Sequence, residues 1–285
     1  MSESRVGVLG ARSLVGGCVL PALRDAGWQV VAFSRQTLKS NLGLAWQRLP
    51  CTDDIGEIPS WICLAPLWVL PDYFALIEAS GARRVVVLSS TSRFTKVGSG
   101  DTAENAIAAK LTNSEARVQA WAEKRGIEWV ILRPTLIYGL GRDKNVCEIA
   151  RFILRFGFFP ILGKAQGLRQ PIHVEDVAAA CFSALLAPDA ANRAYNLSGG
   201  ETLTYREMVA RVFVGMGSRP RLLTVPLWAF RLAVSMLRRL PRYRQWSAAM
   251  AERMNQDLVF DHAEAVRDLG FKPRGFALAA EDLPL

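Results

Sequence analysis

The sequence lacks the paired cysteines that a disulfide framework or a structural zinc site requires. Its five cysteines are odd in number and widely spaced, and no two of them form a C-x-x-C pair. Cys18, Cys63 and Cys181 stand in apolar runs, as buried small residues do. We therefore expect a protein of a reducing compartment that binds no metal.

The sequence also lacks the signals of export and of nucleic-acid binding. Its first apolar run is too short for a secretory leader and is broken by glycines, so we expect a cytoplasmic protein. The net charge of +9 would suit nucleic acid, a membrane surface or an anionic small molecule. Nucleic acid fits least, because the first 200 residues contain no basic segment interleaved with aromatic residues.

What the sequence does contain is a regular alternation of short apolar runs with segments of helical character. Continuous apolar strands that alternate with helices indicate a parallel sheet covered on both faces. We therefore predict an α/β protein with a doubly wound, parallel Rossmann sheet. The predicted strands are 6–9, 30–33, 61–64, 85–88 and 129–132, and the predicted helices between them are 14–23, 71–80 and 103–124.

The pattern changes after Gly141. An amphipathic helix is predicted at 145–156, a second helix at 174–186 and a strand at 194–197, and the chain is mostly helical and basic from Glu201 onward. We predict a smaller, mostly helical C-terminal lobe that binds a substrate or a partner. The predicted division is a Rossmann domain of residues 1–142 and 168–199, and a lobe of residues 143–167 and 200–285.

The segment from Val8 to Gly16 joins the first predicted strand to the first predicted helix. Gly10 permits a tight turn, the small Ser13 lets the backbone approach a pyrophosphate, and Gly16 lets helix and strand pack closely. Phosphates would then bind the exposed N–H groups at the positive end of the helix. Because strand, turn, helix and second strand follow in this order, the segment predicts a dinucleotide site, with a tight turn that binds nothing as the alternative.

The end of the second predicted strand indicates which dinucleotide is preferred. A carboxylate at this place would bind the ribose 2′-hydroxyl of NAD and repel a 2′-phosphate. The sequence has Ser34 and Arg35 instead, and a second guanidinium at Arg12 in the turn. Two arginines near one phosphate offer charge-assisted contacts, so we predict NADP in preference to NAD. The alternative is that either arginine is a solvated surface residue.

Four further segments resemble one family in the family's own order. They are 85–92 (VVVLSSTS), 132–139 (LRPTLIYG), 169–177 (RQPIHVEDV) and 195–200 (YNLSGG). Together they resemble the fifth strand, the "RP…YG" segment, the "R-x-x-I-H-V-x-D-V" segment and the "YN…GG" turn of the extended short-chain dehydrogenase/reductase family. That family includes nucleotide-sugar epimerases and dehydratases.

The resemblance implies roles for residues along the carboxyl edge of the sheet. Thr91 takes the place of the family's catalytic Ser/Thr, and Arg169 would lie near the diphosphate of a nucleotide sugar. His173 would be a structural or pocket-edge residue. The full set of expected cofactor-binding residues is Gly10, Arg12, Ser13, Leu14, Val15, Ser34, Arg35, Leu64, Ala65, Pro66, Ser89, Ser90, Lys110, Arg133, Pro134 and Thr135.

One departure from the family concerns its catalytic Tyr-x-x-x-Lys pair. The i,i+4 spacing stacks both side chains on one helix face, where the lysine lowers the pKa of the phenol. In this sequence Lys110 takes the lysine's place, as a catalytic and ribose-binding candidate, but Ala106 takes the place of the tyrosine. No tyrosine lies between Tyr73 and Tyr138. Tyr138 is a candidate for contact with the substrate, or else packs in the core.

Residues 222–246 carry a very apolar stretch followed by arginines and aromatics. The stretch is shorter than the ~20 consecutive apolar residues that a membrane span needs, because Pro226 and Arg231 interrupt it. Three interpretations stay open: a helix that lines a substrate cleft, an interfacial helix at lipid head groups, and a lobe helix packed on the Rossmann body.

The sequence thus supports two functions of different classes. The first is an NAD(P)-dependent epimerase, dehydratase or reductase that acts on a nucleotide sugar or a similar anionic small molecule. The second is a non-catalytic NADPH-binding protein with a structural, assembly or redox-sensing role. Ala106 favours the second function. Either protein could be a monomer or a homodimer, for which the helix at 103–124 offers a surface.

Overall fold

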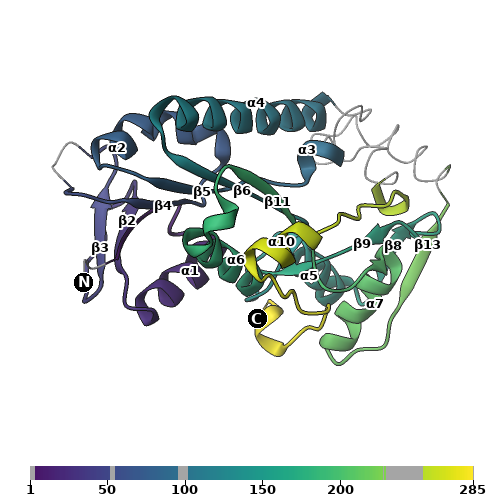
Figure 1. Ribbon diagram of the computed structural model, residues 1–285. Coiled ribbons are helices and arrows are strands. Elements are labelled where there is room, and N and C mark those ends of the chain that lie inside the picture. The colour runs from purple at the N-terminus through teal and green to yellow at the C-terminus, as the bar shows by residue number, and fades with distance from the viewer. Residues whose placement is uncertain (1–3, 52–54, 96–101, 227, 229–252, 285) are drawn as a thin grey trace.

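The computed structural model describes residues 4–51, 55–95, 102–226, 228 and 253–284. Its centre is a seven-stranded sheet in the order β11-β6-β5-β4-β1-β2-β3, with every pair of neighbours parallel (Figure 1). This order confirms the predicted doubly wound α/β fold. The strands are β1 (Arg5–Leu9), β2 (Gln29–Ser34), β3 (Leu44–Arg48), β4 (Ser60–Cys63), β5 (Arg84–Leu88), β6 (Glu128–Pro134) and β11 (Arg193–Leu197).

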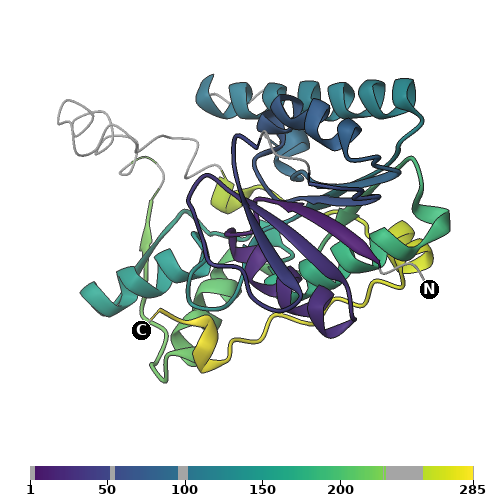
Figure 2. The ribbon, with the colours of Figure 1, turned by 90° about the vertical axis from the view of Figure 1, so that its left-hand side faces the viewer.

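Helices cover both faces of the sheet, which is why its strands are apolar throughout (Figures 1 and 2). Along β6, Val130 and Leu132 pack in the core on one face, and Trp129 and Ile131 in the core on the other. The first face is covered by α1 (Leu14–Asp25), α6 (Val174–Leu186) and α10 (Ala263–Leu269). The second is covered by η1 (Leu67–Tyr73), α2 (Phe74–Ala79) and α4 (Thr102–Arg125).

Two elements near the edge of the sheet differ from the prediction. Strand β3 was not expected, because its residues are only partly buried and alternate weakly between polar and apolar. It pairs with β2 alone and therefore forms the edge of the sheet. The helix predicted at 71–80 is divided into η1 and α2, since Pro71 cannot donate the backbone hydrogen bond that a continuous α-helix needs.

A third apolar core lies beside the sheet and includes Ile149, Ile161, Phe213 and Phe276. It is built from α5 (Val146–Phe156), β8 (Phe159–Leu162), α7 (Tyr205–Gly215) and β13 (Leu222–Val225). Short strands connect this region to the main body: β7 (Ile137–Tyr138) with β10 (Ile172–His173), and β9 (Leu168–Arg169) with β12 (Leu203–Thr204). Further short helices are α3 (Ser92–Thr95), η2 (Pro188–Ala190) and η4 (Ala280–Asp282).

The segment from Leu222 onward, which was predicted to be helical, begins as a strand. Leu222–Val225 is strand β13, which pairs in parallel with β8, so this part of the prediction is wrong. The pairing partner lies about 60 residues earlier in the chain, where local sequence gives no sign of it. Residues 227 and 229–252 lie outside the described residues. None of the described helices has the length and hydropathy needed to cross a membrane.

Candidate functional site

The turn after β1 is built so closely against its neighbour that only glycine fits. Gly10 has a φ of +76°, and a Cβ there would lie 2.3 Å from the backbone nitrogen of Ala65. A Cβ on Gly16 would lie 2.2 Å from the carbonyl oxygen of Ala11. The turn is closed by the N–H of Ser13, which donates to the carbonyl of Gly10 at 2.9 Å. Gly10 thus allows the turn to pack against the backbone after β4, and Gly16 allows α1 to pack against the backbone of the turn. A dinucleotide-binding turn requires such close approaches.

The turn ends at the N-terminus of α1, where backbone donors are exposed. Ser13 is the N-cap, and its Oγ accepts the N–H of Gly16 at 3.1 Å. The N–H groups of Leu14 and Val15, in the first turn, have no partner within the helix. No acidic residue lies in this first turn. The positive end of the helix is therefore open to an anion.

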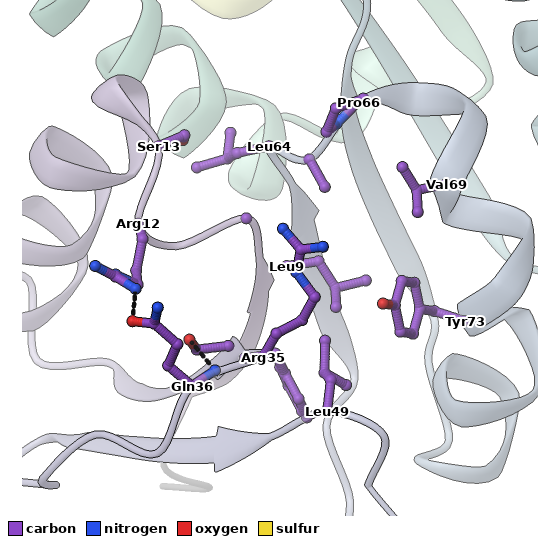
Figure 3. A pocket seen from close by; sticks show the side chains of 14 residues that line it. Leu9, Arg12, Ser13, Arg35, Gln36, Leu49, Leu64, Pro66, Val69 and Tyr73 are labelled. Carbon is purple, nitrogen blue, oxygen red and sulfur yellow. Dashed lines mark hydrogen bonds between the residues drawn. The ribbon is translucent and has the colours of Figure 1, made fainter.

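A pocket of about 710 Å³ opens beside this turn, at the carboxyl ends of β1, β2 and β4 (Figure 3). Its volume is in the range of cofactor sites, about 300–1,000 Å³. None of the residues that line it is acidic. The lining residues are Leu9, Gly10, Arg12, Ser13, Phe33, Ser34, Arg35, Gln36, Leu49, Leu64, Ala65, Pro66, Val69 and Tyr73.

Two guanidinium groups lie on one side of the pocket (Figure 3). Arg12 donates to the side-chain oxygen of Gln36, and the backbone N–H of Gln36 donates to the Oγ of Ser34 at 3.0 Å. Arg35 is exposed, and Figure 3 shows its side chain extending toward the centre of the pocket. The residues expected to recognise a 2′-phosphate thus lie together around one opening.

The opposite wall consists of residues that the sequence did not indicate. Val69 and Tyr73 face Arg12 across the pocket, and Leu49 lies beside Arg35 (Figure 3). Leu49 follows the unpredicted edge strand β3, and Val69 and Tyr73 belong to η1. No sequence motif marks them, since they reach the pocket only through the packing of these two elements.

The residues expected at the nicotinamide end lie at the carboxyl ends of β5 and β6, outside the lining of this pocket. The backbone N–H and the Oγ1 of Thr91 both donate to the carbonyl of Pro134, at 3.1 and 3.2 Å. Thr135 donates through its Oγ1 to the carbonyl of Gln170. Ser89 and Arg133 hydrogen-bond to Glu115 of α4. The contact of these residues with a cofactor stays a prediction.

Glu115, which the sequence did not indicate, contacts two of the residues expected at the nicotinamide end. Its side chain is 1% exposed, yet it is surrounded by donors. It accepts from Ser89 at 2.5 Å, from Arg133 at 2.6 Å and from Arg93. A glutamate within a long helix usually indicates a solvated face, so no sequence signal distinguished it from its neighbours.

Ala106 and Lys110 lie on the exposed side of α4. The buried side of the same helix carries Ala108, Leu111 and Glu115. The ammonium of Lys110 lies 5.9 Å from the ring centroid of Trp68 in η1. The ammonium of Lys110 thus lies above η1, which also contributes Val69 and Tyr73 to the pocket, and its contact with a cofactor stays a prediction.

We expect Lys110→Ala to change the affinity for NADPH by less than about twofold, because Lys110 is exposed and rests on Trp68. Fluorescence titration of the reduced nicotinamide measures this. The comparison is Arg12→Ala, which removes a guanidinium from the pocket and should weaken binding about tenfold. A loss of tenfold or more in Lys110→Ala would place the ammonium at the cofactor after all.

The two predicted substrate residues are engaged inside the protein. Tyr138 is fully buried between the rings of His173 and Phe276, and its hydroxyl donates to the carbonyl of Ala277 at 3.4 Å. Burial, together with nearby Asp282, raises the pKa of Tyr138 to about 12. The phenol is therefore neutral near pH 7, and it packs as a core residue does.

Arg169 is also buried, with an exposure of 5%. Its guanidinium donates to the backbone carbonyls of Leu168, Arg253 and Gln256. Desolvation by burial lowers its pKa from the usual arginine value. These contacts fix Arg169 as a bridge between β9 and residues 253–256. Its contact with a diphosphate stays a prediction.

His173 caps α6 and connects it to the C-terminal segment. Its Nδ1 accepts the N–H of Glu175 at 3.3 Å, and its Nε2 lies 3.0 Å from Oδ1 of Asp282. Both partners occupy the ring nitrogens, which suits the structural role that the resemblance implied. Within the described ranges, no three His, Cys, Asp or Glu side chains are placed to hold a metal ion.

We expect Gly10→Ala to destabilise the protein by about 3 kcal/mol and to abolish cofactor binding. The cost combines a positive φ on a residue with a Cβ and the clash with the backbone of Ala65. Gly17→Ala is the matched control, because a Cβ on Gly17 meets nothing within 4 Å and alanine favours the helix. Thermal melting and NADPH titration of both variants test this, and equal melting temperatures would contradict it.

Residues 73–198 match the model of the NAD dependent epimerase/dehydratase family. This segment is therefore similar to that family. The match confirms the resemblance that the motifs predicted.

Relatives of known name align over part of the chain. A UDP-glucose 4-epimerase of Vibrio cholerae is 26% identical over 165 residues, which cover 57% of this chain and 48% of the relative. Subunit 9 of the NADH dehydrogenase [ubiquinone] 1 alpha subcomplex, from mitochondria of Arabidopsis thaliana, is 29% identical over 119 residues, 41% of this chain and 28% of the relative. The alignments thus span about half the length of the curated relatives, or less.

Solved structures share the fold over nearly the whole chain. A UDP-glucuronic acid 4-epimerase from Bacillus cereus, in complex with NAD, has a TM-score of 0.70 at 14% identity and covers 98% of this chain and 95% of its own. MoeE5, in complex with UDP-glucuronic acid and NAD, has a TM-score of 0.70 at 22% identity with the same coverage. At these identities the likeness establishes the fold.

Proposed function

We propose that this chain binds a nicotinamide dinucleotide in the 710 Å³ pocket and prefers NADP to NAD. The observation that carries the proposal is the lining itself, in which Arg12, Arg35 and Ser34 face one opening and no carboxylate is present. A 2′-phosphate would meet two guanidinium groups there. A carboxylate for the 2′-hydroxyl of NAD, in contrast, has no candidate in the lining.

Residues suited to each part of a nicotinamide dinucleotide are present. The Gly10 turn and the first N–H groups of α1 would hold the pyrophosphate, since a Cβ would fill the space at the turn. The apolar wall of Leu49, Val69 and Tyr73 would hold the adenine. Ser89, Ser90, Thr91, Arg133, Pro134 and Thr135 would lie near the nicotinamide. Solved neighbours of the same fold hold NAD, which supports this class of cofactor.

We propose further that the substrate is a nucleotide sugar or a similar anionic molecule. A neighbour of the same fold is named for UDP-glucuronic acid and UDP-glucose complexes, and the Vibrio relative for UDP-glucose. The hydroxyl of Thr91, at the carboxyl end of β5, is the polar group that would approach the sugar. Open α/β sheets bind their ligands at this edge.

A second candidate is non-catalytic binding of NADPH. It is favoured by Ala106, because an alanine methyl group in the place of the family's catalytic tyrosine cannot transfer a proton. A subunit of an NADH dehydrogenase is among the relatives, so a role as a subunit of a larger assembly is in keeping with this candidate.

One experiment separates the two. The purified protein is mixed with NADP⁺ and either UDP-glucose or UDP-glucuronic acid, and the reduced nicotinamide and the sugar are followed by absorbance and NMR. An enzyme gives reduced cofactor or an altered sugar that depends on the protein. A binding protein gives neither, while calorimetry still detects the cofactor. Absence of cofactor binding would refute both candidates.

A further inference from the structure

A cluster of one carboxylate and two guanidinium groups lies where β5 and β6 end. Glu115 accepts hydrogen bonds from Arg93 and from both Nε and Nη2 of Arg133. The Oγ of Ser89 donates to the same carboxylate at 2.5 Å. Phe94 covers the cluster, with its ring centroid 5.0 Å from the Cζ of Arg93 and 5.4 Å from that of Arg133.

The charges of this cluster do not cancel. Glu115 supplies one negative charge against two positive ones, and among the described residues no other carboxylate lies within 4 Å of either guanidinium. The side chains of Arg93 and Arg133 are only 21% and 14% exposed. A positive charge held so far from water is costly unless an anion accompanies it.

The unused hydrogen-bonding capacity lies mainly on Arg93. A guanidinium has five N–H donors, and the bond from Nη1 to Glu115 is the one that the guanidinium of Arg93 makes to the described residues. All the acceptor capacity of Glu115 is directed at Ser89 and the two arginines. Glu115 therefore fixes the orientation of Arg93 without consuming its remaining donors.

The location of the cluster connects it to a substrate. Arg93 lies two residues after Thr91, in the short helix α3 that follows β5. Phe94 contacts Phe260 from the C-terminal part of the chain, with centroids 6.0 Å apart. The cluster thus stands between the carboxyl edge of the sheet and the second part of the chain. Open α/β proteins bind their substrates at the carboxyl edge of the sheet.

We infer that Arg93 forms an anion subsite that recognises a carboxylate on the sugar of the substrate. The inference rests on the proposed nucleotide-sugar function and narrows it to sugars that carry an acid group. Arg93 would contact the carboxylate directly. Glu115 and Ser89 are positioning residues, since they act through Arg93 and Arg133. A cluster with a purely structural role would instead be indifferent to the charge of the sugar.

UDP-glucose and UDP-glucuronic acid make a matched pair of probes, because they differ at the carboxylate. Their dissociation constants are measured by calorimetry for the protein saturated with NADP⁺. UDP-glucuronic acid is expected to bind about tenfold more tightly, the effect of one charge-assisted hydrogen bond. In Arg93→Gln the two probes should bind with about equal affinity. The affinity for UDP-glucose should stay within about twofold of that of the unmodified protein. Arg93→Lys keeps the charge and should retain part of the preference.

The control is Arg117→Gln, which removes the same charge from an exposed position on α4. It should keep the tenfold preference, and melting curves establish that each variant is folded. Equal affinity of the unmodified protein for the two probes would overturn the inference and leave the proposed function intact. A tenfold preference for UDP-glucuronic acid that persists in Arg93→Gln would also overturn the inference. If neither probe binds, the proposed substrate class is wrong, and the inference fails with it.

Discussion

Arg35→Asp is expected to weaken the binding of NADPH about a hundredfold and to leave the binding of NADH nearly unchanged. The substitution removes a guanidinium from the pocket and places a carboxylate beside the 2′-phosphate, so attraction becomes repulsion. The 2′-hydroxyl of NADH can instead donate to the new carboxylate. Calorimetric titration with each nucleotide measures the two dissociation constants.

The matched control for this variant is Arg117→Asp, which makes the same charge change on the exposed side of α4. Because Arg117 is absent from the lining of the pocket, this control should affect both nucleotides equally and by less than about twofold. An equal loss of NADPH and NADH affinity in Arg35→Asp would refute the assignment of Arg35 to the 2′-phosphate.

Glu115→Ala is expected to lower the free energy of unfolding by about 3–5 kcal/mol. The substitution leaves the guanidinium groups of Arg93 and Arg133 facing one another without their shared carboxylate. For a protein of this size the loss corresponds to a fall in the melting temperature of roughly 10 °C. Thermal unfolding followed by circular dichroism measures it.

Glu123→Ala is the control on the same helix, since Glu123 is exposed. It should change the free energy of unfolding by less than about 0.5 kcal/mol. Glu115→Gln keeps hydrogen-bonding atoms near the arginines but removes the charge, so its melting temperature should lie between those of Glu115→Ala and the unmodified protein. A melting temperature of Glu115→Ala equal to that of the control would mean that the cluster contributes nothing to stability.

The sequence was sufficient for the parts of the molecule that local patterns determine. Apolar runs predicted the strands of the central sheet other than β3, because burial on both faces leaves no polar alternation. Gly10 and Gly16 marked the turn, since backbone contacts as close as theirs exclude every other residue. Arg12 and Arg35 could be predicted as pocket residues because Arg12 lies in the turn after β1 and Arg35 directly follows β2, and the carboxyl ends of these neighbouring strands lie side by side.

The rest depended on packing that no local pattern records. Ala106 and Lys110 share a face of α4 by their spacing, but which face meets the sheet is decided by Ala108, Leu111 and Val118. Glu115 belongs to the buried face although it is charged, because its partners come from β6, from α3 and from the end of β5. Likewise β13 exists only through its pairing with β8.

The central claim is that the pocket between the Gly10 turn and Tyr73 binds a dinucleotide through its 2′-phosphate. Calorimetric titration of the unmodified protein with NADPH and with NADH tests it most directly. The arrangement of Arg12, Arg35 and Ser34 predicts that NADPH binds at least about tenfold more tightly. Equal dissociation constants, or tighter binding of NADH, would contradict it.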